Sequence, residues 1–574
     1  MRAMKKVLTW YLKPYYGRMM IGFVIKFVGT IMDLCLPWVL AYMIDTVIPI
    51  GDKTLIFVWG FVMLVCSILA LTFNVIANRM ASKVARDTTE TIRHDLFGRI
   101  MWLSNAQTDG FTKPSLISRL TTDTYNVHQM LGRVQRLGVR APILVVGGVL
   151  VTLTLDPVLT LVLISVMPII IGITVYVSKK SIPMYTSLQE SVDQFVRLIR
   201  EDVAGIRVIK ALSRTDCEKR RYDAINQEVV QKEKKAGITM ASVNPSMNLF
   251  LNLGLVMVVI AGAYRVNNGL SEVGKILAFL TYFTIILNAM MNISKMFVVI
   301  SKAVASADRI MEVIDATEDM VLEVCKRMED ENAYIRFQNV SFSYNKKEPN
   351  ISNINFSLQK GETLGIIGAT GAGKSTVAQL LMRFYDPDEG AISIEGQDIR
   401  SIPTGELREK FGVVFQNDTL FEDTIIGNVD LGRGLSKQEI KDAICYAKAK
   451  EFVEEKGRGY ENQVNIRGAN LSGGQKQRIL IARALAAHPD ILILDDSSSA
   501  LDYKTDAMLR KELKEHFADT TTIIVAQRIS SVMHADQILV LEEGQMLGLG
   551  THEELMESCD IYREIAASQM GEVV

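Results

Sequence analysis

The protein has 574 residues, of which 49% are hydrophobic and 22% are charged, with a formal net charge of −1. A chain of this length exceeds what one hydrophobic core supports, so at least two domains are expected. The balanced charge argues against a nucleic-acid partner. The six cysteines are scattered without CxxC spacing, which excludes a recognisable disulfide framework or cysteine metal site.

The hydrophobic excess lies before residue 300, in long apolar runs. The first run follows a basic N-terminus, but it is too long for a signal peptide and no small-residue cleavage site follows it. Runs of this length cross a bilayer as helices, so the chain should be embedded in one. The six predicted spans are Met19–Ile44, Leu55–Ala77, Leu137–Leu155, Leu159–Val177, Met247–Ala263 and Ile276–Val299.

Charge in the loops between these runs predicts their orientation. The segments 79–140 and 179–235 are long and rich in Lys and Arg, whereas 45–54, 155–158 and 264–274 are short and nearly free of them. By the positive-inside rule, the N-terminus, both long loops and the C-terminal domain are cytoplasmic. We therefore expect a multi-pass protein of the plasma membrane.

Polar residues inside the spans have two interpretations. Lys26 and Asp33 share one helix face, and Asp33 either lines a cavity or joins neighbouring helices through a salt bridge. Rows of amides and methionines in the fifth and sixth spans either form an adaptable cavity or pack the helices together. These rows contain Asn244, Asn248, Asn252, Asn288, Asn292, Met247, Met257, Met290, Met291 and Met296.

The pattern becomes polar and charged between Ser301 and Glu331, and strands then alternate with helices. We expect a transmembrane domain over 1–318, a linker over 319–333 and a second domain over 334–574.

A phosphate-binding loop is predicted at the start of the second domain. The sequence GATGAGKS at Gly368–Ser375 fits G-x-x-x-x-G-K-[ST] and lies between an apolar strand and a helical pattern. Lys374 would reach the β and γ oxygens of a nucleotide, and Ser375 would ligate Mg²⁺. The loop residues assigned to nucleotide binding are Gly368, Thr370, Gly371, Ala372, Gly373, Lys374, Ser375 and Thr376.

Further along, LSGGQ at Leu471–Gln475 opens a helical pattern, whose N-terminus favours anions. The buried strand Ile491–Leu494 then delivers Asp495 and Asp496 at its carboxyl end, where α/β sheets bind ligands. Asp495 would hold the Mg²⁺.

Residues 334–570 resemble the ATP-binding domain of an ABC transporter through GATGAGKST, Gln416 in VVFQNDTLF, LSGGQ, ILILDD and SSSALD. The resemblance implies an all-α six-helix transmembrane domain followed by an α/β P-loop ATPase domain. It implies two ATP molecules between two such domains, each held by the loop of one chain and the LSGGQ of the other. Tyr344 would stack on adenine, Gln416 would contact the metal and the γ-phosphate, and Ser472, Gly474 and Gln475 would face the partner's ATP.

The two long loops resemble the coupling segments of ABC exporters, near Asp109–Asn126 and Ala204–Arg214. The resemblance implies that these segments contact the ATP domains. The alternative is a surface turn followed by a solvated helix.

Three positions depart from the family pattern. Asp496 stands where the family has its catalytic glutamate, Gln527 where it has histidine, and Ile466 where exporters carry glutamate. A shorter carboxylate lies about 1.5 Å further back from its water, and glutamine cannot shuttle a proton. The residues assigned to catalysis are Asp496, Gln527 and Gln416, of which Gln416 keeps the family residue. The changes at Asp496 and Gln527 predict a site that binds ATP and hydrolyses it slowly.

We therefore expect this chain to form a heterodimer with a second half-transporter. The heterodimer would be a multidrug-type exporter of small hydrophobic or amphipathic compounds. Open alternatives are an exporter-fold importer, a lipid or peptide exporter, a soluble ABC ATPase acting on DNA or ribosomes, and a nucleotide-gated channel or regulator. The apolar runs argue against the soluble ATPase.

Overall fold

The computed structural model describes residues 2–318, 320–324, 333–344, 346–455, 457–497 and 500–570. Most of the predicted linker over 319–333 lies outside these residues, as does Ser499 of the SSSALD motif. The chain forms two compact units. The first contains 1–101 and 113–316, and the second contains 317–574 together with the segment 102–112.

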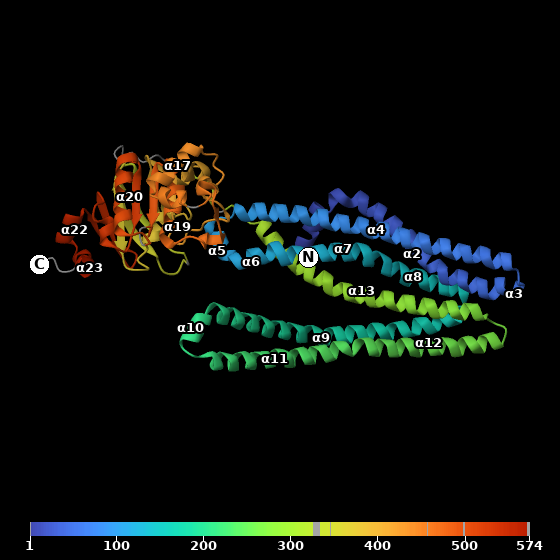
Figure 1. Ribbon diagram of the computed structural model, residues 1–574. Coiled ribbons are helices and arrows are strands. Elements are labelled where there is room, and N and C mark those ends of the chain that lie inside the picture. The colour runs from blue at the N-terminus through green and yellow to red at the C-terminus, as the bar shows by residue number, and fades with distance from the viewer. Residues whose placement is uncertain are drawn as a thin grey trace. The chain divides into compact units, whose positions relative to one another are not determined.

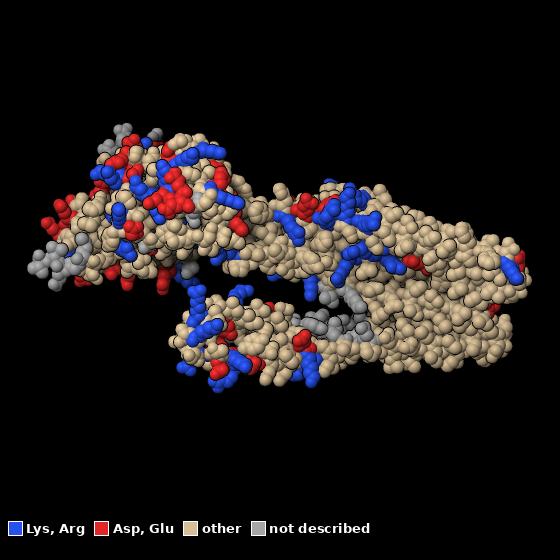
Figure 2. Space-filling view, in the orientation of Figure 1, with Lys and Arg blue, Asp and Glu red and all other residues tan. Residues whose placement is uncertain are grey.

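The first unit is entirely helical where it is described, and its longest helices run alongside one another (Figure 1). Figure 2 shows these helices almost free of charged side chains toward α3, with Lys and Arg gathered toward their other ends. The α-helices are α1 (Arg2–Lys6), α2 (Tyr16–Tyr42), α3 (Ile48–Ile50), α4 (Lys53–Met101), α6 (Lys113–Ser118), α7 (Thr124–Arg133), α8 (Val139–Leu155), α9 (Pro157–Ala204), α10 (Ile206–Ala211), α11 (Thr215–Ala241), α12 (Val243–Asn267) and α13 (Val273–Ile314). Short π and 3-10 turns join them: η1 (Val7–Tyr11), η2 (Lys13–Tyr15), η3 (Met43–Val47), η4 (Arg119–Asp123) and η5 (Val134–Gly138).

Among the described residues, five helical stretches are long and apolar enough to cross a membrane: Lys13–Ile50, Lys53–Met101, Lys113–Leu155, Pro245–Asn267 and Val273–Ile293. The span predicted at Leu159–Val177 is not among these five. It lies on α9, whose described apolar part, Pro157–Ile173, is shorter than the others. These apolar helices agree with the prediction that the chain is embedded in a membrane.

The charged residues inside the spans pack helices together. Lys26 is 3% exposed and donates to Asn78 Oδ1 of α4 at 3.0 Å. Asp33 accepts hydrogen bonds from Arg140 at 2.9 Å and from Asn74 at 3.2 Å. These contacts tie α2 to α4 and α8, which agrees with the salt-bridge interpretation.

The amide and methionine rows divide between the core and the surface of the first unit. Met247 and Met290 are buried in the helical core. Asn252 lines an open groove on α12 and α13 beside Thr281 and Thr284, while the side chain of Asn244 lies outside the described residues.

A buried polar network joins η4 and α7 to α13. The Asp123 carboxylate is fully buried and accepts from Ser306 at 2.7 Å and from Arg309. Asn126 donates to the same Ser306 hydroxyl at 3.0 Å. A buried carboxylate is stable only where such donors replace its water.

We expect Asp123→Ala to destabilise the first unit by about 1.5–3 kcal/mol, the range for hydrogen bonds to a charged group. The thermal unfolding midpoint of the full chain in detergent measures this. Glu201→Ala removes an exposed pair with Arg221 at 3.5 Å and serves as the control, with an expected change below about 1 kcal/mol. Equal midpoints for the two variants would contradict a stabilising role for the network.

The second unit is built on a ten-stranded sheet in the order β5-β4-β1-β2-β12-β11-β3-β10-β9-β6. Strands β11, β3, β10, β9 and β6 are parallel neighbours. The remaining strands pair antiparallel, except that β12 and β2 pair in parallel at Gln545 and Ser352. The strands are β1 (Ile335–Phe342), β2 (Ile351–Leu358), β3 (Thr363–Gly368), β4 (Glu389–Ile394), β5 (Gln397–Asp398), β6 (Phe411–Val414), β9 (Ile491–Asp495), β10 (Thr521–Val525), β11 (Gln537–Glu542) and β12 (Gln545–Gly550). A separate pair consists of β7 (Asp423–Thr424) and β8 (Gln463–Val464).

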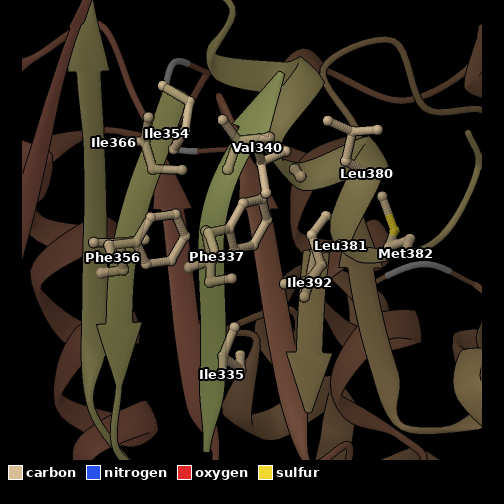
Figure 3. Close-up of a cluster of buried hydrophobic side chains, with 14 of the residues drawn as sticks. Ile335, Phe337, Val340, Ile354, Phe356, Ile366, Leu380, Leu381, Met382 and Ile392 are labelled. Carbon is tan, nitrogen blue, oxygen red and sulfur yellow. The ribbon is translucent and has the colours of Figure 1, made fainter. Parts of the chain in front are cut away.

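Helix α14 (Lys374–Leu381) lies against the parallel strands β3, β9 and β10, and its buried side chains share one core cluster with those of the antiparallel strands. Figure 3 shows Leu381 beside Ile392, and Phe337 beside Phe356; the ring centroids of the two phenylalanines lie 4.5 Å apart. The other helices of this unit are α5 (Asn105–Phe111), α15 (Thr404–Glu409), α16 (Ile425–Asp430), α17 (Lys437–Tyr446), α18 (Lys450–Glu454), α19 (Gly473–Leu485), α20 (Tyr503–His516), α21 (Ile529–Val532), α22 (His552–Ser558) and α23 (Asp560–Met570), with 3-10 turns η6 (Ile399–Ser401), η7 (Gly459–Glu461) and η8 (Ile466–Gly468).

Candidate functional site

The predicted phosphate-binding loop connects the end of β3 to the start of α14. Gly373 has a φ of 93°, and a Cβ there would approach Ile351 Cγ2 to 2.5 Å and the Asn350 carbonyl to 2.9 Å. A Cβ at Gly368 would approach the Leu541 carbonyl to 2.0 Å. Both positions therefore require glycine, and the loop wraps tightly in front of the first turn of α14.

Lys374 lies across this loop. Its ammonium donates to the carbonyls of Gly368 at 2.9 Å and Ala369 at 2.7 Å. Burial lowers the pKa of Lys374, and the carboxylates of Asp495 and Asp496 oppose that shift. A positive charge is thereby held close to two carboxylates and to the backbone that would surround a nucleotide's phosphates.

Ser375 and Asp495 bring together two oxygen ligands from adjacent elements. The Ser375 hydroxyl donates to Asp495 Oδ1 at 3.1 Å, and Asp495 ends β9. Burial raises the pKa of Asp495, and the hydrogen bond from Ser375 lowers it. One hydroxyl and one carboxylate suit Mg²⁺, which takes few protein ligands and completes its shell with water and phosphate oxygens. The described residues contain no cluster of three or more His, Cys, Asp or Glu side chains that would form a different metal site.

Most of the predicted phosphate-binding, metal-binding and catalytic residues meet around one cavity of about 270 Å³ at the carboxyl edge of the parallel strands. Asp496 follows β9 in the left-handed conformation, with a φ of 51° that aspartate tolerates better than most residues. The lining of the cavity consists of Asn350, Thr370, Gly371, Gly373, Lys374, Ser375, Thr376, Gln416, Asp495, Asp496, Val525, Ala526 and Gln527. Gly368 and Ala372 are not in this lining and shape the loop behind it.

Three lining residues escaped the sequence analysis. Asn350 precedes β2, and its side chain accepts from the Tyr344 backbone N–H at 2.9 Å. Val525 ends β10, which lies between β3 and β9, and Ala526 directly follows that strand. The strand order that places them here is a long-range property, although their position directly before Gln527 was a usable local signal.

Tyr344 stands at the edge of the site within an aromatic cluster. Its ring makes edge contacts with Phe342 and Tyr385 at centroid distances of 4.9 and 5.1 Å. Its hydroxyl donates to Gln379 Oε1 at 2.9 Å. Tyr385 in turn donates to Asp109 at 2.6 Å, so part of the first predicted coupling segment packs within the second unit, beside the predicted adenine-stacking residue.

The LSGGQ segment is absent from the lining of the described cavity. Ser472 caps α19 by accepting from the Gln475 N–H at 3.2 Å, while Gln475 Oε1 accepts from the Ser472 N–H at 3.2 Å. This capping box leaves Ser472 exposed at the helix start and Gly474 partly exposed. Ile466, nearby in sequence, is 65% exposed. The segment is thus a capped helix start on the surface of the unit, where a helix N-terminus favours negative charge.

Comparison with known proteins places both halves of the chain in one family. A model described as the ABC transporter transmembrane region matches residues 19–290, and one described as ABC transporter matches residues 351–499. The chain is 35% identical over 572 residues to YfiB of Bacillus subtilis, described as an uncharacterized ABC transporter ATP-binding protein, covering 99% of both chains. It is 28% identical over 573 residues to exp8 of Streptococcus pneumoniae, described as a putative ABC transporter ATP-binding protein, covering 99% of this chain and 97% of exp8.

A solved structure of a bacterial Atm1-family ABC exporter with ATP bound has the same fold. Its TM-score is 0.82 at 25% identity, covering 98% of this chain and 99% of that chain. The predicted fold class, a helical transmembrane domain followed by an ABC-type ATPase domain, is confirmed. The chain belongs to the ABC transporters, as an exporter-type half-transporter whose ATPase domain binds ATP and couples its hydrolysis to transport across a membrane.

Proposed function

We propose that this chain is the hydrolysis-poor subunit of a heterodimeric exporter of hydrophobic and amphipathic compounds. It lies in the plasma membrane with its N-terminus and ATPase domain in the cytoplasm, as the loop charges predict. The observation that supports the proposal most strongly is that Asp496 and Gln527, the two departures from the family pattern, line the same cavity as Lys374 and Asp495.

The residues that hold a nucleotide are retained at this cavity. Lys374 contacts the phosphates, and Ser375, Gln416 and Asp495 hold Mg²⁺. The residues that activate water are the ones that changed, since Asp496 is one methylene shorter than glutamate and Gln527 carries no titratable proton. Such a site retains ATP as a holding ligand and cleaves it slowly.

The LSGGQ segment has the opposite character, because its sequence and capping box are intact. Its exposed helix start is not among the residues that line this chain's own cavity. A partner with its own loop, glutamate and histidine would complete an efficient site against Ser472 and Gly474. The chain thus contributes the LSGGQ half of the productive site and the half of the slow site that carries Lys374.

Exposed apolar side chains support a partner at the second coupling segment. Ile206, Val208 and Leu212 on and beside α10 are 45%, 61% and 65% exposed at the tip of the α9–α11 hairpin (Figure 1). Apolar groups clustered at the tip of a charged helical hairpin mark a protein contact. The partner's ATPase domain is the expected cover.

The test uses Gly474→Asp in the pair that co-purifies with the tagged full chain. Aspartate suits the first turn of a helix, although its Cβ would lie 3.1 Å from the Ala500 carbonyl, which must shift by a few tenths of an ångström. The aspartate places a negative charge where the partner's γ-phosphate should bind. We expect the ATPase rate of the pair to fall at least about 100-fold, while ATP binding at this chain's own cavity changes less than about twofold.

Gln438→Asp is the matched control, because it occupies the second position of α17, which begins with the same type of capping box. It should leave the ATPase rate unchanged. Recovery of the full chain as an active homodimer, or an unaffected rate in Gly474→Asp, would contradict the proposal.

A further inference from the structure

The segment that carries Gln527 is a short connection with few bonds of its own. It runs from the end of β10 at Val525 to the start of α21 at Ile529. The Ala526 N–H donates to the Ile366 carbonyl at 3.1 Å. Arg528, at the N-cap position of α21, makes no side-chain cap, so the first N–H of that helix needs a partner from elsewhere.

That partner is a side chain from the last described helix. Gln569 Oε1 accepts from the Ile529 N–H at 2.8 Å, and Gln569 Nε2 donates to the Gln527 carbonyl at 2.8 Å. One amide therefore bridges both sides of Arg528 with two bonds of ordinary length. The bridge fixes the backbone of the residue whose side chain lines the ATP cavity.

Helix α23 holds Gln569 in this position through its buried face. Tyr562 and Ala566 are 0% and 4% exposed and pack with Ala526, Ile529 and neighbouring apolar residues. Gln569 follows Tyr562 by seven residues and Ala566 by three, so all three lie on one face of the helix. The Tyr562 hydroxyl also contacts His552 Nδ1 at 2.7 Å, which anchors α23 to α22.

We infer that Gln569 is a positioning residue for the γ-phosphate contact made by Gln527, acting through the backbone. This inference rests on the proposed function and takes one further step, that the Gln527 amide in the cavity lining donates a hydrogen bond to the γ-phosphate of the bound ATP. Without the bridge, the segment samples other conformations, and the affinity for a triphosphate falls by the fraction of time that Gln527 is misplaced. A diphosphate has no γ-phosphate, so its affinity is unaffected.

The experiment measures the dissociation constants of Mg²⁺–AMP-PNP and Mg²⁺–ADP by calorimetry on the purified full chain. We expect Gln569→Leu to lower the preference for the triphosphate analogue by about threefold or more, with ADP affinity unchanged within about twofold. Gln527→Ala should lower the preference at least as much, and the double variant should lose no more than Gln527→Ala alone.

Gln569→Glu provides a second variant. It keeps an acceptor for the Ile529 N–H but sets a carboxylate oxygen against the Gln527 carbonyl, so the same loss is expected. Gln438→Leu is the control, since it removes an exposed hydrogen bond to Asp442 at 2.8 Å on α17. If Gln527→Ala lowers the preference and both Gln569 variants leave it unchanged, the inference fails and the proposed site stands. If Gln527→Ala itself has no effect, the proposed γ-phosphate contact fails and the inference fails with it.

Discussion

Replacing the partner's catalytic glutamate with glutamine is expected to nearly abolish the ATPase activity of the co-purified pair, whereas Asp496→Asn should lower it less than about twofold. General-base catalysis contributes about 10²–10⁴-fold, or about 2.7–5.5 kcal/mol of barrier. The site on this chain should contribute little to turnover, because the Asp496 carboxylate is too short to activate water. Steady-state ATPase rates of the reconstituted pair provide the measurement.

A control must show that the Asp496 variant still contains nucleotide at this chain's cavity. Asp495→Asn provides the comparison, because Asp495 lies 3.1 Å from the Ser375 hydroxyl at the expected Mg²⁺ position. It should weaken retention of Mg²⁺–ATP, whereas Asp496→Asn should not. A larger loss of turnover from Asp496→Asn than from the partner's variant would overturn the assignment of the slow site to this chain.

The second large effect is a gain of activity. The double variant Asp496→Glu/Gln527→His should raise the ATPase rate of the full chain purified without a partner by about 10²–10⁴-fold, since it restores the missing methylene and a group that transfers protons. Residue 496 has a φ of 51°, a conformation that costs a longer side chain at most about 1–2 kcal/mol. That cost falls on folding and is smaller than the expected gain of about 2.7–5.5 kcal/mol in the barrier.

The matched comparison is Asp496→Asn/Gln527→His, which carries the histidine without a carboxylate. Its ATPase rate should remain at the level of the unmodified chain. An unchanged rate in Asp496→Glu/Gln527→His, with nucleotide still bound, would show that these two positions do not set the speed of the site. Ile466, which is exposed where exporters carry glutamate, would then be the next position to restore.

Local sequence was sufficient for the phosphate-binding loop, because its glycines and Lys374 act within a few residues of one another. Asp495 was predictable because it ends an apolar strand, and the carboxyl ends of parallel strands meet at one edge. Apolar run length identified the membrane helices, but it gave no information on their neighbours. The contacts of Lys26 with Asn78 and of Asp33 with Arg140 depend on which helices pack together.

The positions that escaped prediction are those set by long-range pairing. Asn350 and Val525 reach the cavity through the order of the strands. Gln569 lies 42 residues beyond Gln527, and an exposed glutamine near a chain end carries no local sign of a specific role. The spacing that does matter, Tyr562, Ala566 and Gln569 on one helix face, becomes meaningful only when the partner of that face is known.

The assignment of residues 102–112 to the second unit means that the polypeptide passes between the two units three times, near residues 101, 112 and 316. Helix α5 lies in the segment 102–112, where the chain leaves the membrane-embedded unit and then returns to it. A soluble fragment beginning at residue 334 would therefore lack this segment, and the Tyr385 hydroxyl would lose its hydrogen-bond acceptor Asp109. The nucleotide-binding unit is therefore connected to the membrane-embedded unit by the polypeptide at three points, and two of these connections flank the short helix α5.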